Sequence, residues 1–423
     1  MTAGPLHTAE SDLVAACCAE ARALLARNLV AEGVLAATPT EAAAARSYDS
    51  IFGRDASICA LGMAISQDAR LHSEAPTGLL TLARYQARNG QIPNFVDPRR
   101  HEADFWYVGC IDATLWWVLA VAWVDKELPQ HGLAAKLSRE VAQAIVWLSC
   151  QEHQRFFLLQ QNEASDWADI MPRSGFVLYT NALWYMVKRQ YGLANVTDTA
   201  RHFATLFQPF AGPIPEYRRA ALLMRYARES ARNRDLFLSF VNLSFVGDEG
   251  DVFGNLLAIL AGLADEDATQ RIIRALLGAR ANDPYPVRVV CNPILEGSDS
   301  WRPYMARHRQ NFPQQYQNGG IWPLVGAFWV IALAQSGQRS FAASELERLA
   351  HANALSDWSF SEWLHGRTLE PQGMRGQSWN AAAFLLAHHA LRSPKPLFRA
   401  AKSAGDADAR IDEDANSMMR SSS

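Results

Sequence analysis

The sequence of 423 residues lacks the patterns that mark several common classes of protein. None of its apolar runs reaches the roughly 18 residues that would span a bilayer, and its first residues, MTAGPLHTAESD, have no basic start followed by an apolar core. Its 40 Lys and Arg nearly balance its 43 Asp and Glu, so the net charge of -3 gives no reason to expect a nucleic acid or an anionic membrane as a partner. We therefore expect a cytoplasmic protein that acts on a small molecule.

Cysteine is sparse, and its spacing excludes the usual metal motifs. The six residues form no C-x-x-C pair and mostly lie in apolar helical runs; they are Cys17, Cys18, Cys59, Cys110, Cys150 and Cys291. We expect buried, reduced thiols rather than disulfides or metal ligands. Phosphate-binding loop patterns are absent as well, so the sequence predicts neither a metal nor a cofactor.

The chain does contain an almost unbroken series of helical patterns from Ser11 to Leu391. About twelve helices are expected, alternating between amphipathic and nearly all-apolar ones. A helix that is apolar all round must be surrounded by protein, whereas one with a polar face can lie outside. The pattern predicts an all-α fold, a toroid of six inner and six outer helices called the (α/α)6 barrel.

The expected organisation is one domain over residues 10–393. A loose N-terminal tail is expected over residues 1–9, and a disordered C-terminal tail over 394–423, which is rich in Ala, Ser and charge. The outer helices are expected from Glu10 through the run that ends at Leu29, and at 75–88, 133–151, 215–232, 267–278 and 339–352. The inner ones follow the polar loops that end near residues 55, 112, 176, 251, 321 and 378.

The long loops all fall before the inner helices, so they gather at one end of the barrel. Helix N-termini also point toward that end and present free amide donors there, which makes it the natural place for a pocket. These loops contain the polar candidates Arg54, Asp55, Asp112, Asp166, Asp169, Asp248, Glu249, Asp251, Gln317, Asn318, Glu362, Arg375 and Gln377. Two carboxylates from distant loops could flank a glycosidic bond, one protonating the leaving oxygen and the other activating water.

The most informative stretch is residues 162–185, which places Glu163, Asp166 and Asp169 around Trp167 in a polar loop before an apolar helix that begins near Phe176. A carboxyl group beside an indole is suited to staying protonated near neutral pH. Aromatic residues are also frequent, with 13 Trp, 11 Tyr and 19 Phe, and aromatic faces beside carboxylates suit the apolar faces and hydroxyl edges of sugars.

A structural explanation competes with the functional one at each position. An Asp before a helix is more often a cap than a catalyst, Arg54 could merely pair with a neighbouring acid, and the Asn-Gly-Gly of 318–320 could be only a turn. The recurrence of polar, Trp-containing clusters before nearly every inner helix favours function.

Several motifs make a resemblance specific. They are PVRVVCNPILEGSDSW at 286–301, YQNGGIWP at 316–323, IFGRD at 51–55, CIDATLWW at 110–117, DVFGNLLAI at 251–259, SFSEW at 359–363 and RGQSWNAA at 375–382. In sequence and order the chain resembles the neutral/alkaline invertases, (α/α)6 glycoside hydrolases that cleave sucrose. More distantly it is similar to amylo-α-1,6-glucosidases and to mannosyl- and glucosylglycerate hydrolases.

The resemblance implies an inverting mechanism with a general acid and a general base. The resemblance assigns the general acid to Asp169, with Asp166 as the alternative, and the general base to Glu362 in SFSEW. The expected substrate-binding residues are Arg54, Asp55, Asp112, Trp167, Arg173, Gln317, Asn318, Trp322, Arg375, Gln377 and Trp379. Core packing is an equal alternative for Trp322 and Trp379.

The chain departs from the invertases where the leaving group should bind. After the acid it has Ile170 and Met171 in place of a basic pair, and after the base it has Trp363, Leu364 and His365. Sucrose is the first expectation, and an α-1,6-glucoside or a glucosyl- or mannosylglycerate is the alternative. An acidic aglycone would need a basic residue near the mouth; the candidates are Arg173, Arg302 and Arg375.

Two further alternatives come from outside the hydrolases. A sugar epimerase would use histidines such as His308 and His365, but His does not recur before several inner helices. A non-catalytic sugar-binding protein would not need Asp169 or Glu362. The outer helices could also pack in a homo-oligomer, although solvated faces are the commoner outcome.

Overall fold

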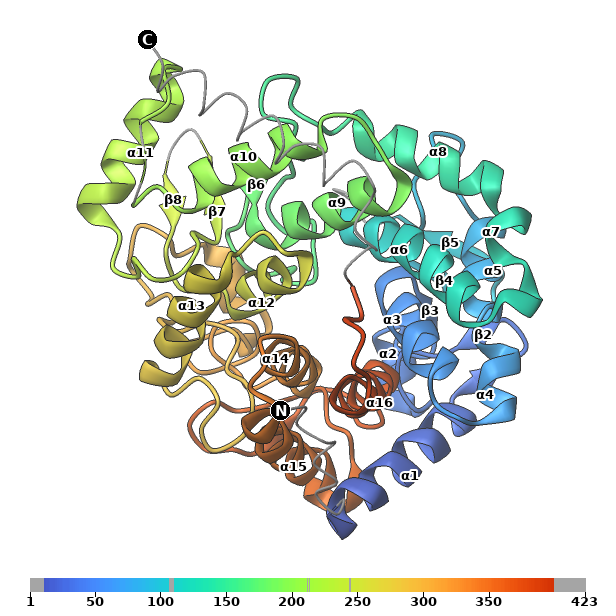
Figure 1. The fold of residues 1–423 in the computed structure, drawn as a ribbon. Coiled ribbons are helices and arrows are strands. Elements are labelled where there is room, and N and C mark those ends of the chain that lie inside the picture. Colours follow the sequence, from blue (N-terminus) through green and yellow to red (C-terminus); the bar gives the residue numbers. More distant parts are fainter. Residues whose placement is uncertain (1–10, 106–109, 211, 213, 243–244, 399–423) are drawn as a thin grey trace, which may run out of the picture.

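The structure, a computed structural model, describes residues 11–105, 110–210, 212, 214–242 and 245–398. Six helices form a closed inner ring, each in contact with the next along the chain and the last in contact with the first (Figure 1). They are α3 (Gly53–Ala64), α6 (Ile111–Glu127), α9 (Leu178–Tyr191), α12 (Val252–Ala261), α14 (Pro323–Gln335) and α16 (Ser378–Arg392). The predicted (α/α)6 toroid is confirmed.

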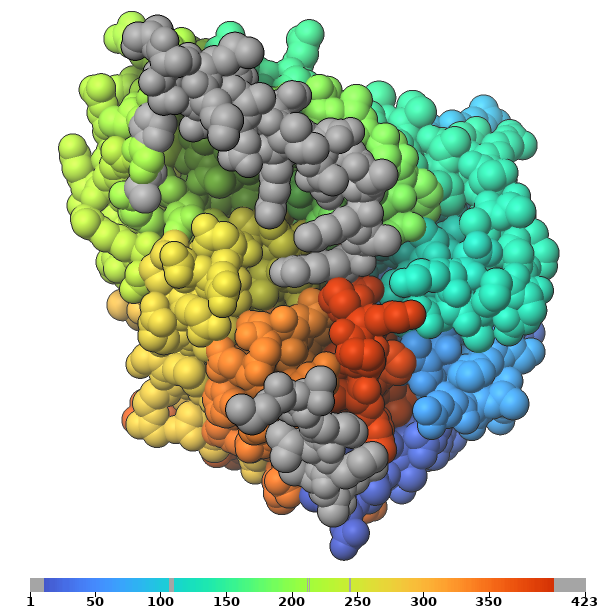
Figure 2. Space-filling model, viewed as in Figure 1, coloured from blue at the N-terminus to red at the C-terminus, as the bar shows by residue number. Residues whose placement is uncertain are grey.

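A second layer of helices lies outside this ring, and most of them pack on an inner helix. The outer layer comprises α1 (Asp12–Arg27), α4 (Ala69–Glu74), α5 (Thr77–Arg84), α7 (Leu133–Lys136), α8 (Ser138–Ser149), α10 (Val196–Phe207), α11 (Arg218–Ser230), α13 (Glu266–Gly278) and α15 (Arg339–Trp358). Helix α1 contacts both α15 and α16, which closes the toroid, and Figure 2 shows the blue N-terminal and red C-terminal parts side by side.

The sequence placed one outer helix between the third and fourth inner helices, at about 215–232, but the structure has two there. Helix α10, which the prediction missed, packs on α9 and buries Phe203, Leu206 and Phe207 on one face. The apolar residues of this face recur at helical spacing, but no side chain caps the helix, so its start is weakly marked.

The alternation of apolar and amphipathic helices explains the two layers. Every residue of α12 is buried, and in α14 only the final Gln335 is not. Helix α8, by contrast, buries Val141, Ala144 and Leu148 on a single face. Burial of apolar surface therefore assigns each helix to its layer.

Two inner helices approach each other closely because a glycine lies at their contact. A Cβ atom on Gly62 of α3 would stand 2.4 Å from the carbonyl oxygen of Ala382 in α16. These small residues let the two neighbouring helices pack backbone to backbone.

Short antiparallel strands, which the sequence did not indicate, tie the loops together at the N-terminal ends of the inner helices. The described residues form four such sheets. Two of them have two strands: β1 (Leu29–Val30) pairs with β2 (Gly33–Val34), and β9 (Trp363–Leu364) pairs with β10 (Pro371–Gln372). The other two have three strands, in the order β3 (Ile51–Phe52), β4 (Phe95–Asp97), β5 (Glu102–Asp104) and in the order β6 (Phe176–Val177), β7 (Phe240–Val241), β8 (Val246–Gly247). In register, Phe52 faces Phe95 and Trp363 faces Gln372. Two short helical segments lie in the same loops, α2 (Glu41–Ala45) and the 3-10 segment η2 (Pro303–Arg309). A third, η1 (Pro129–His131), joins α6 to α7.

The opposite end of the ring is covered by the chain that follows α16. Leu397 is buried and its carbonyl accepts a hydrogen bond of 3.1 Å from Nε1 of Trp123, while Phe398 stacks on Phe328 of α14 with ring centroids 6.0 Å apart. Of the predicted tails at 1–9 and 394–423, residues 1–9 and 399–423 lie outside the described residues, whereas 394–398 pack against the ring. In the described part of the chain, none of the helices has the length and apolar character needed to cross a membrane.

Candidate active site

Glu362 lies at the centre of the loop end of the ring. It follows α15 and precedes β9, and it is 3% exposed. The Tyr48 hydroxyl donates a hydrogen bond of 2.7 Å to its Oε1, and the backbone N–H of Met374 donates one of 3.0 Å to its Oε2. Both oxygens are therefore held in a fixed orientation by donors from two other loops.

Burial raises the pKa of Glu362 from an ordinary 4.5 to about 7, against the opposing effect of the hydrogen bonds from Tyr48 and Met374. The negative charge of Asp169 also raises this pKa. A group with a pKa near neutrality changes protonation in the physiological range.

Asp169 faces the same space from the loop before α9, and it is half-buried. Its removal from bulk water raises its pKa, whereas a hydrogen bond of 3.0 Å from Nε2 of Gln317 to Oδ1 lowers it. The upward shift expected for a carboxyl group in this Trp-containing loop is confirmed. Gln317 also donates to the carbonyl of Trp167 and accepts from the N–H of Ile170, so it clamps the Asp169 loop on three points.

The neighbouring Asp166 has a different environment. Its Oδ1 accepts from the N–H of Ala168 and from Nη2 of Arg173 at 2.7 Å, and its Oδ2 accepts from Nε2 of Gln161 at 2.8 Å. Arg173 is 3% exposed and reaches Asp251 with Nη1 at 2.8 Å. Asp166 and Arg173 are thus internal supports of the loop, with the guanidinium 5.9 Å from the Trp167 ring.

A second buried charge cluster forms where α3 and α6 begin. Nη1 of Arg54 lies 3.1 Å from Oδ2 of Asp112, which also accepts from the Tyr179 hydroxyl, and Nε of Arg54 lies 3.4 Å from Oδ1 of Asp55. Burial raises the pKa of Asp55 to about 6, although Arg54 opposes this shift. Neither Asp55 nor Asp112 is an N-cap, because Phe52 and Cys110 occupy those positions.

Aromatic rings form the floor between these carboxyl groups. Trp322 packs edge-on against Trp167 at 5.3 Å and against Trp379 at 6.0 Å, and Tyr316 lies 5.1 Å from Trp322. The Arg54 guanidinium lies 5.3 Å from the Trp379 ring. This floor joins the Asp169 loop to the Arg54 cluster and the Gln377 loop.

Several buried polar atoms in these loops have no hydrogen-bond partner among the described residues. They are Oδ1 of Asp112, Nε1 of Trp167, Nε1 of Trp379, and both Oε1 and Nε2 of Gln377. Such atoms are costly unless water or a ligand satisfies them. The set mixes donors and acceptors and thus suits hydroxyl groups, which can both donate and accept.

Other predicted residues are engaged elsewhere. Asn318 is fully buried and bonds to the backbone of Ile294 and Asn311, so it holds a turn. Arg375 is exposed and donates to the carbonyl of Ser356. The structure does not bring either residue's polar atoms to the carboxyl pair, and Gln317 acts on the loop instead.

The sequence analysis missed the tyrosines that hold the carboxylates. Tyr48 contacts Glu362, and Tyr179 contacts Asp112. Tyr48 lies in the polar loop before α3, six residues from Arg54, and this proximity was an available signal. Tyr179 lies in the first turn of an apolar helix, where sequence alone favours core packing.

The described residues contain no group of three or more His, Cys, Asp or Glu side chains placed to hold a metal ion. His365 uses Nδ1 to accept from the N–H groups of Arg367 and Thr368. It therefore holds a turn and is not directed at a substrate by any contact in the structure.

Comparisons with known families match two parts of this toroid. The alkaline and neutral invertase model matches residues 251–394, and the amylo-alpha-1,6-glucosidase model matches residues 26–208. Probable alkaline/neutral invertase D from Arabidopsis thaliana is 31% identical over 149 residues, 34% of this chain and 27% of that protein. Cytosolic invertase 1 from Oryza sativa subsp. japonica is 28% identical over 149 residues, 34% of this chain and 26% of that protein.

The chain has the fold and motifs of the invertase-like (α/α)6 glycosidases. It nevertheless spans less than a third of the length of these curated relatives. A mannosylglycerate hydrolase from Thermus thermophilus, solved with Tris and D-glycerate, aligns with a TM-score of 0.60 at 15% identity, over 88% of this chain and 99% of that one. This likeness shows the fold, and the resemblance expected from the motifs is confirmed.

The raised pKa of Glu362 predicts a stabilising substitution. In the wild type, stability is greatest while Glu362 is protonated and falls as the pH rises from about 4.5 through about 7, because the folded state disfavours the ionised form. Glu362→Gln should therefore raise the free energy of unfolding at pH 8.5 by up to about 3 kcal/mol, with little difference at pH 4. Urea unfolding at both pH values measures this.

The matched control is Glu347→Gln, at an exposed position of α15. It should change stability equally little at both pH values. A Glu362→Gln variant that is less stable than the wild type at pH 8.5 would show that Glu362 is ionised in the folded state without cost.

Proposed function

We propose that this protein is an inverting glycoside hydrolase in which Asp169 is the general acid and Glu362 the general base. The observation that carries the proposal is the pair of carboxyl groups at the loop end of the ring: burial raises the pKa of both, and the charge of Asp169 adds to the rise at Glu362. A general acid must be protonated and a base ionised at the working pH, and their environments decide which is which.

Asp169 suits the acid. Gln317 occupies its Oδ1 at 3.0 Å, and the structure gives no hydrogen bond to its Oδ2 from a described residue. The second oxygen can hold a proton and donate it to the glycosidic oxygen. Asp166, the alternative, accepts hydrogen bonds from Ala168, Arg173 and Gln161 on its two oxygens, so it supports the loop.

Glu362 suits the base because its two fixed hydrogen bonds favour the carboxylate and set its orientation. In the proposed step a water molecule attacks the anomeric carbon, Glu362 takes the water proton, and Asp169 gives its proton to the leaving oxygen as the bond to the aglycone breaks. The anomeric configuration inverts. The mechanism requires carboxyl groups about 6.5–9.5 Å apart to leave room for the water.

The unpartnered polar atoms of Asp112, Trp167, Gln377 and Trp379 are the proposed contacts for the sugar ring. Arg54 orients Asp55 and Asp112, and the rings of Trp322 and Trp379 close the floor. Such a mixed polar and aromatic surface binds hydroxyl edges and apolar sugar faces together.

The charges near the site favour a neutral substrate, with the α-glucosidic bond of sucrose as the first candidate. Arg173 is buried and pairs with Asp166 and Asp251, and Arg375 is exposed and donates to the carbonyl of Ser356, so no contact directs either guanidinium at the carboxyl pair. The invertase relatives support sucrose, whereas Ile170 and Met171 replace the basic pair of those enzymes. An α-1,6-glucoside is the neutral alternative.

A charged aglycone has one observation in its favour. Arg302 lies at the rim, 25% exposed, and pairs with Glu163 at 3.2 Å, while Tyr304 donates to the same carboxylate at 2.7 Å. The structural neighbour solved with D-glycerate makes a glucosyl- or mannosylglycerate the second candidate. The carboxylate of such a substrate would have to compete with Glu163 for Arg302.

Glucose release from sucrose, isomaltose, trehalose, maltose and glucosylglycerate tests the assignment. Hydrolysis of a neutral α-glucoside is expected, and Asp169→Asn and Glu362→Gln should each lower kcat by about 10²–10⁴. Asp267→Asn, on the exposed face of α13, is the matched control and should retain wild-type activity. Turnover by either active-site variant at the wild-type rate would overturn the assignment, and turnover of glucosylglycerate alone would select the second candidate.

The pH profile tests the role of Glu362 separately. The kcat/KM should rise through about pH 7 as Glu362 loses its proton, and ionisation of Asp169, whose pKa burial also raises, should lower it. Tyr48→Phe removes a hydrogen bond that lowers the pKa of Glu362, so the rising limb should move up by about one pH unit. If the rising part of the pH profile does not move in Tyr48→Phe, the ionisation that it reports belongs to another group, such as Asp55.

A further inference from the structure

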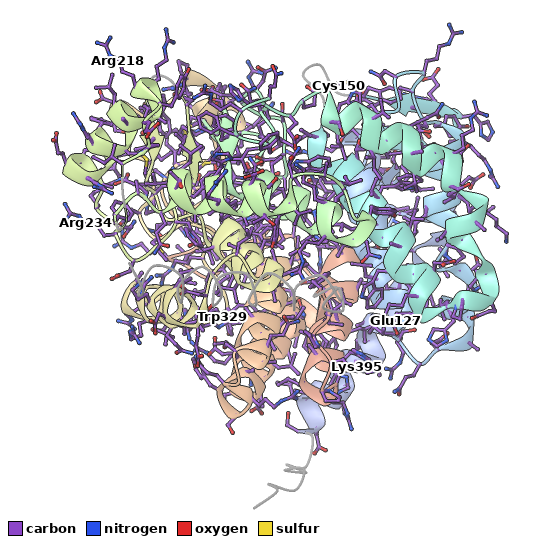
Figure 3. The ribbon with its side chains drawn as sticks, turned by 45° about the horizontal axis from the view of Figure 1, so that its top comes forward. Glu127, Cys150, Arg218, Arg234, Trp329 and Lys395 are labelled. Atoms are coloured by element: carbon purple, nitrogen blue, oxygen red, sulfur yellow. The ribbon has the colours of Figure 1, made fainter. Side chains whose placement is uncertain are left out.

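A hollow lies outside the inner ring, between the end of α8 and the loop that leads to Asp166. It has a volume of about 370 Å³ and is lined by Ile111, Trp147, Cys150, Gln151, Gln160, Gln161, Asn162, Ser165 and Gly175. Cys150, which directly follows α8, is labelled in Figure 3. Glu127, the last residue of α6, is labelled at the other end of the helical ring. The volume is in the range of small-molecule sites.

The lining is distinctive because none of these nine described residues is charged, in a chain with 20% charged residues. Gln151, Gln160 and Asn162 contribute carboxamides, which both donate and accept hydrogen bonds. Trp147 is half-buried and adds an indole. Carboxamides beside an aromatic ring suit a neutral, polyhydroxylated ligand, whereas an ionic ligand would find no countercharge.

The walls of this hollow are fixed by backbone hydrogen bonds. The N–H of Gln160 donates to the carbonyl of Gln151 at 3.0 Å, and Gln161 and Gly175 exchange two bonds of 3.0 and 2.9 Å. The N–H of Ile111 donates to the carbonyl of Ser165 at 2.9 Å. The site is therefore largely preformed, which lowers the entropic cost of binding.

Gln161 separates the hollow from the proposed active site. Its Nε2 donates to Asp166, and its Oε1 accepts a short hydrogen bond from the Thr180 hydroxyl, so both ends of its amide are occupied. A ligand would use the exposed amides of Gln160 and Asn162 instead. The hollow thus faces away from Asp169 and Glu362.

The hollow also continues along the same loop. An adjoining depression of about 630 Å³ shares Gln160 and is lined further by Glu152, His153, Gln154, Arg155 and Phe157. Within it, Glu152 is already paired with the buried Lys188. A ligand with several linked units could extend from the uncharged hollow past Gln160.

We propose that the hollow between α8 and residues 159–165 is an accessory binding site for a neutral saccharide. Binding there needs no bond cleavage, so the proposal stands independently of the hydrolase assignment. Occupancy would hold a saccharide beside the loop that bears the proposed acid.

Protection of Cys150 from alkylation tests the proposal. All six cysteines are within the described residues, and Cys150 is the exposed one. In the full-length Asp169→Asn protein, maltotriose should slow maleimide labelling of Cys150 at least fivefold with a saturable concentration dependence, and glycerol at equal mass should not. Labelling at Cys150 is identified by peptide mass spectrometry.

Two variants make the result specific. Gln160→Ala with Asn162→Ala, both at exposed positions, should abolish the protection while circular dichroism stays unchanged. Cys150→Ser with Ser149→Cys moves the thiol off the lining, and its labelling should be insensitive to maltotriose. Unchanged labelling of Cys150 in maltotriose and in sucrose, or equal protection in the Gln160/Asn162 variant, would overturn the proposal whether or not the protein hydrolyses a glucoside.

Discussion

The withdrawal of carboxyl groups from water at one end of the helical ring is the constraint on which the rest of this structure depends. Asp169 and Glu362 both have raised pKa values because the loops around them exclude water. Retaining such groups costs stability, and the fold offsets the cost with donors from distant loops. Tyr48 and Gln317 are those donors.

A buried ion network supports the loop that contains Asp169. Arg173 bridges Asp166 and Asp251, and thereby ties the loop before α9 to the loop before α12. Breaking such a network by removing one partner leaves a buried charge unpaired, which costs several kcal/mol, about 3–5. The network therefore explains why polar residues recur before successive inner helices even where they do not touch a substrate.

The ring could be predicted from the sequence because the alternation of apolar and amphipathic helices indicates which helix faces are buried. It also singled out the loops, and Asp169, Glu362 and Arg54 are brought together there. It could not distinguish a residue that binds a substrate from one that clamps a loop, since Gln317, Asn318 and Arg173 make contacts with residues far away in sequence. The small sheets and Tyr48 were missed for the same reason: strands of two or three residues have no detectable period, and the contacts of Tyr48 are with residues distant in sequence.

The central claim is that Asp169 and Glu362 invert the configuration of the sugar that they release. The most direct test is proton NMR of the first glucose anomer formed from the α-glucoside that the protein cleaves, recorded before mutarotation. We expect β-glucose first, with its formation lost in Asp169→Asn. Initial α-glucose would contradict the mechanism, because it would require a covalent intermediate on a carboxylate placed too near its partner for water to enter.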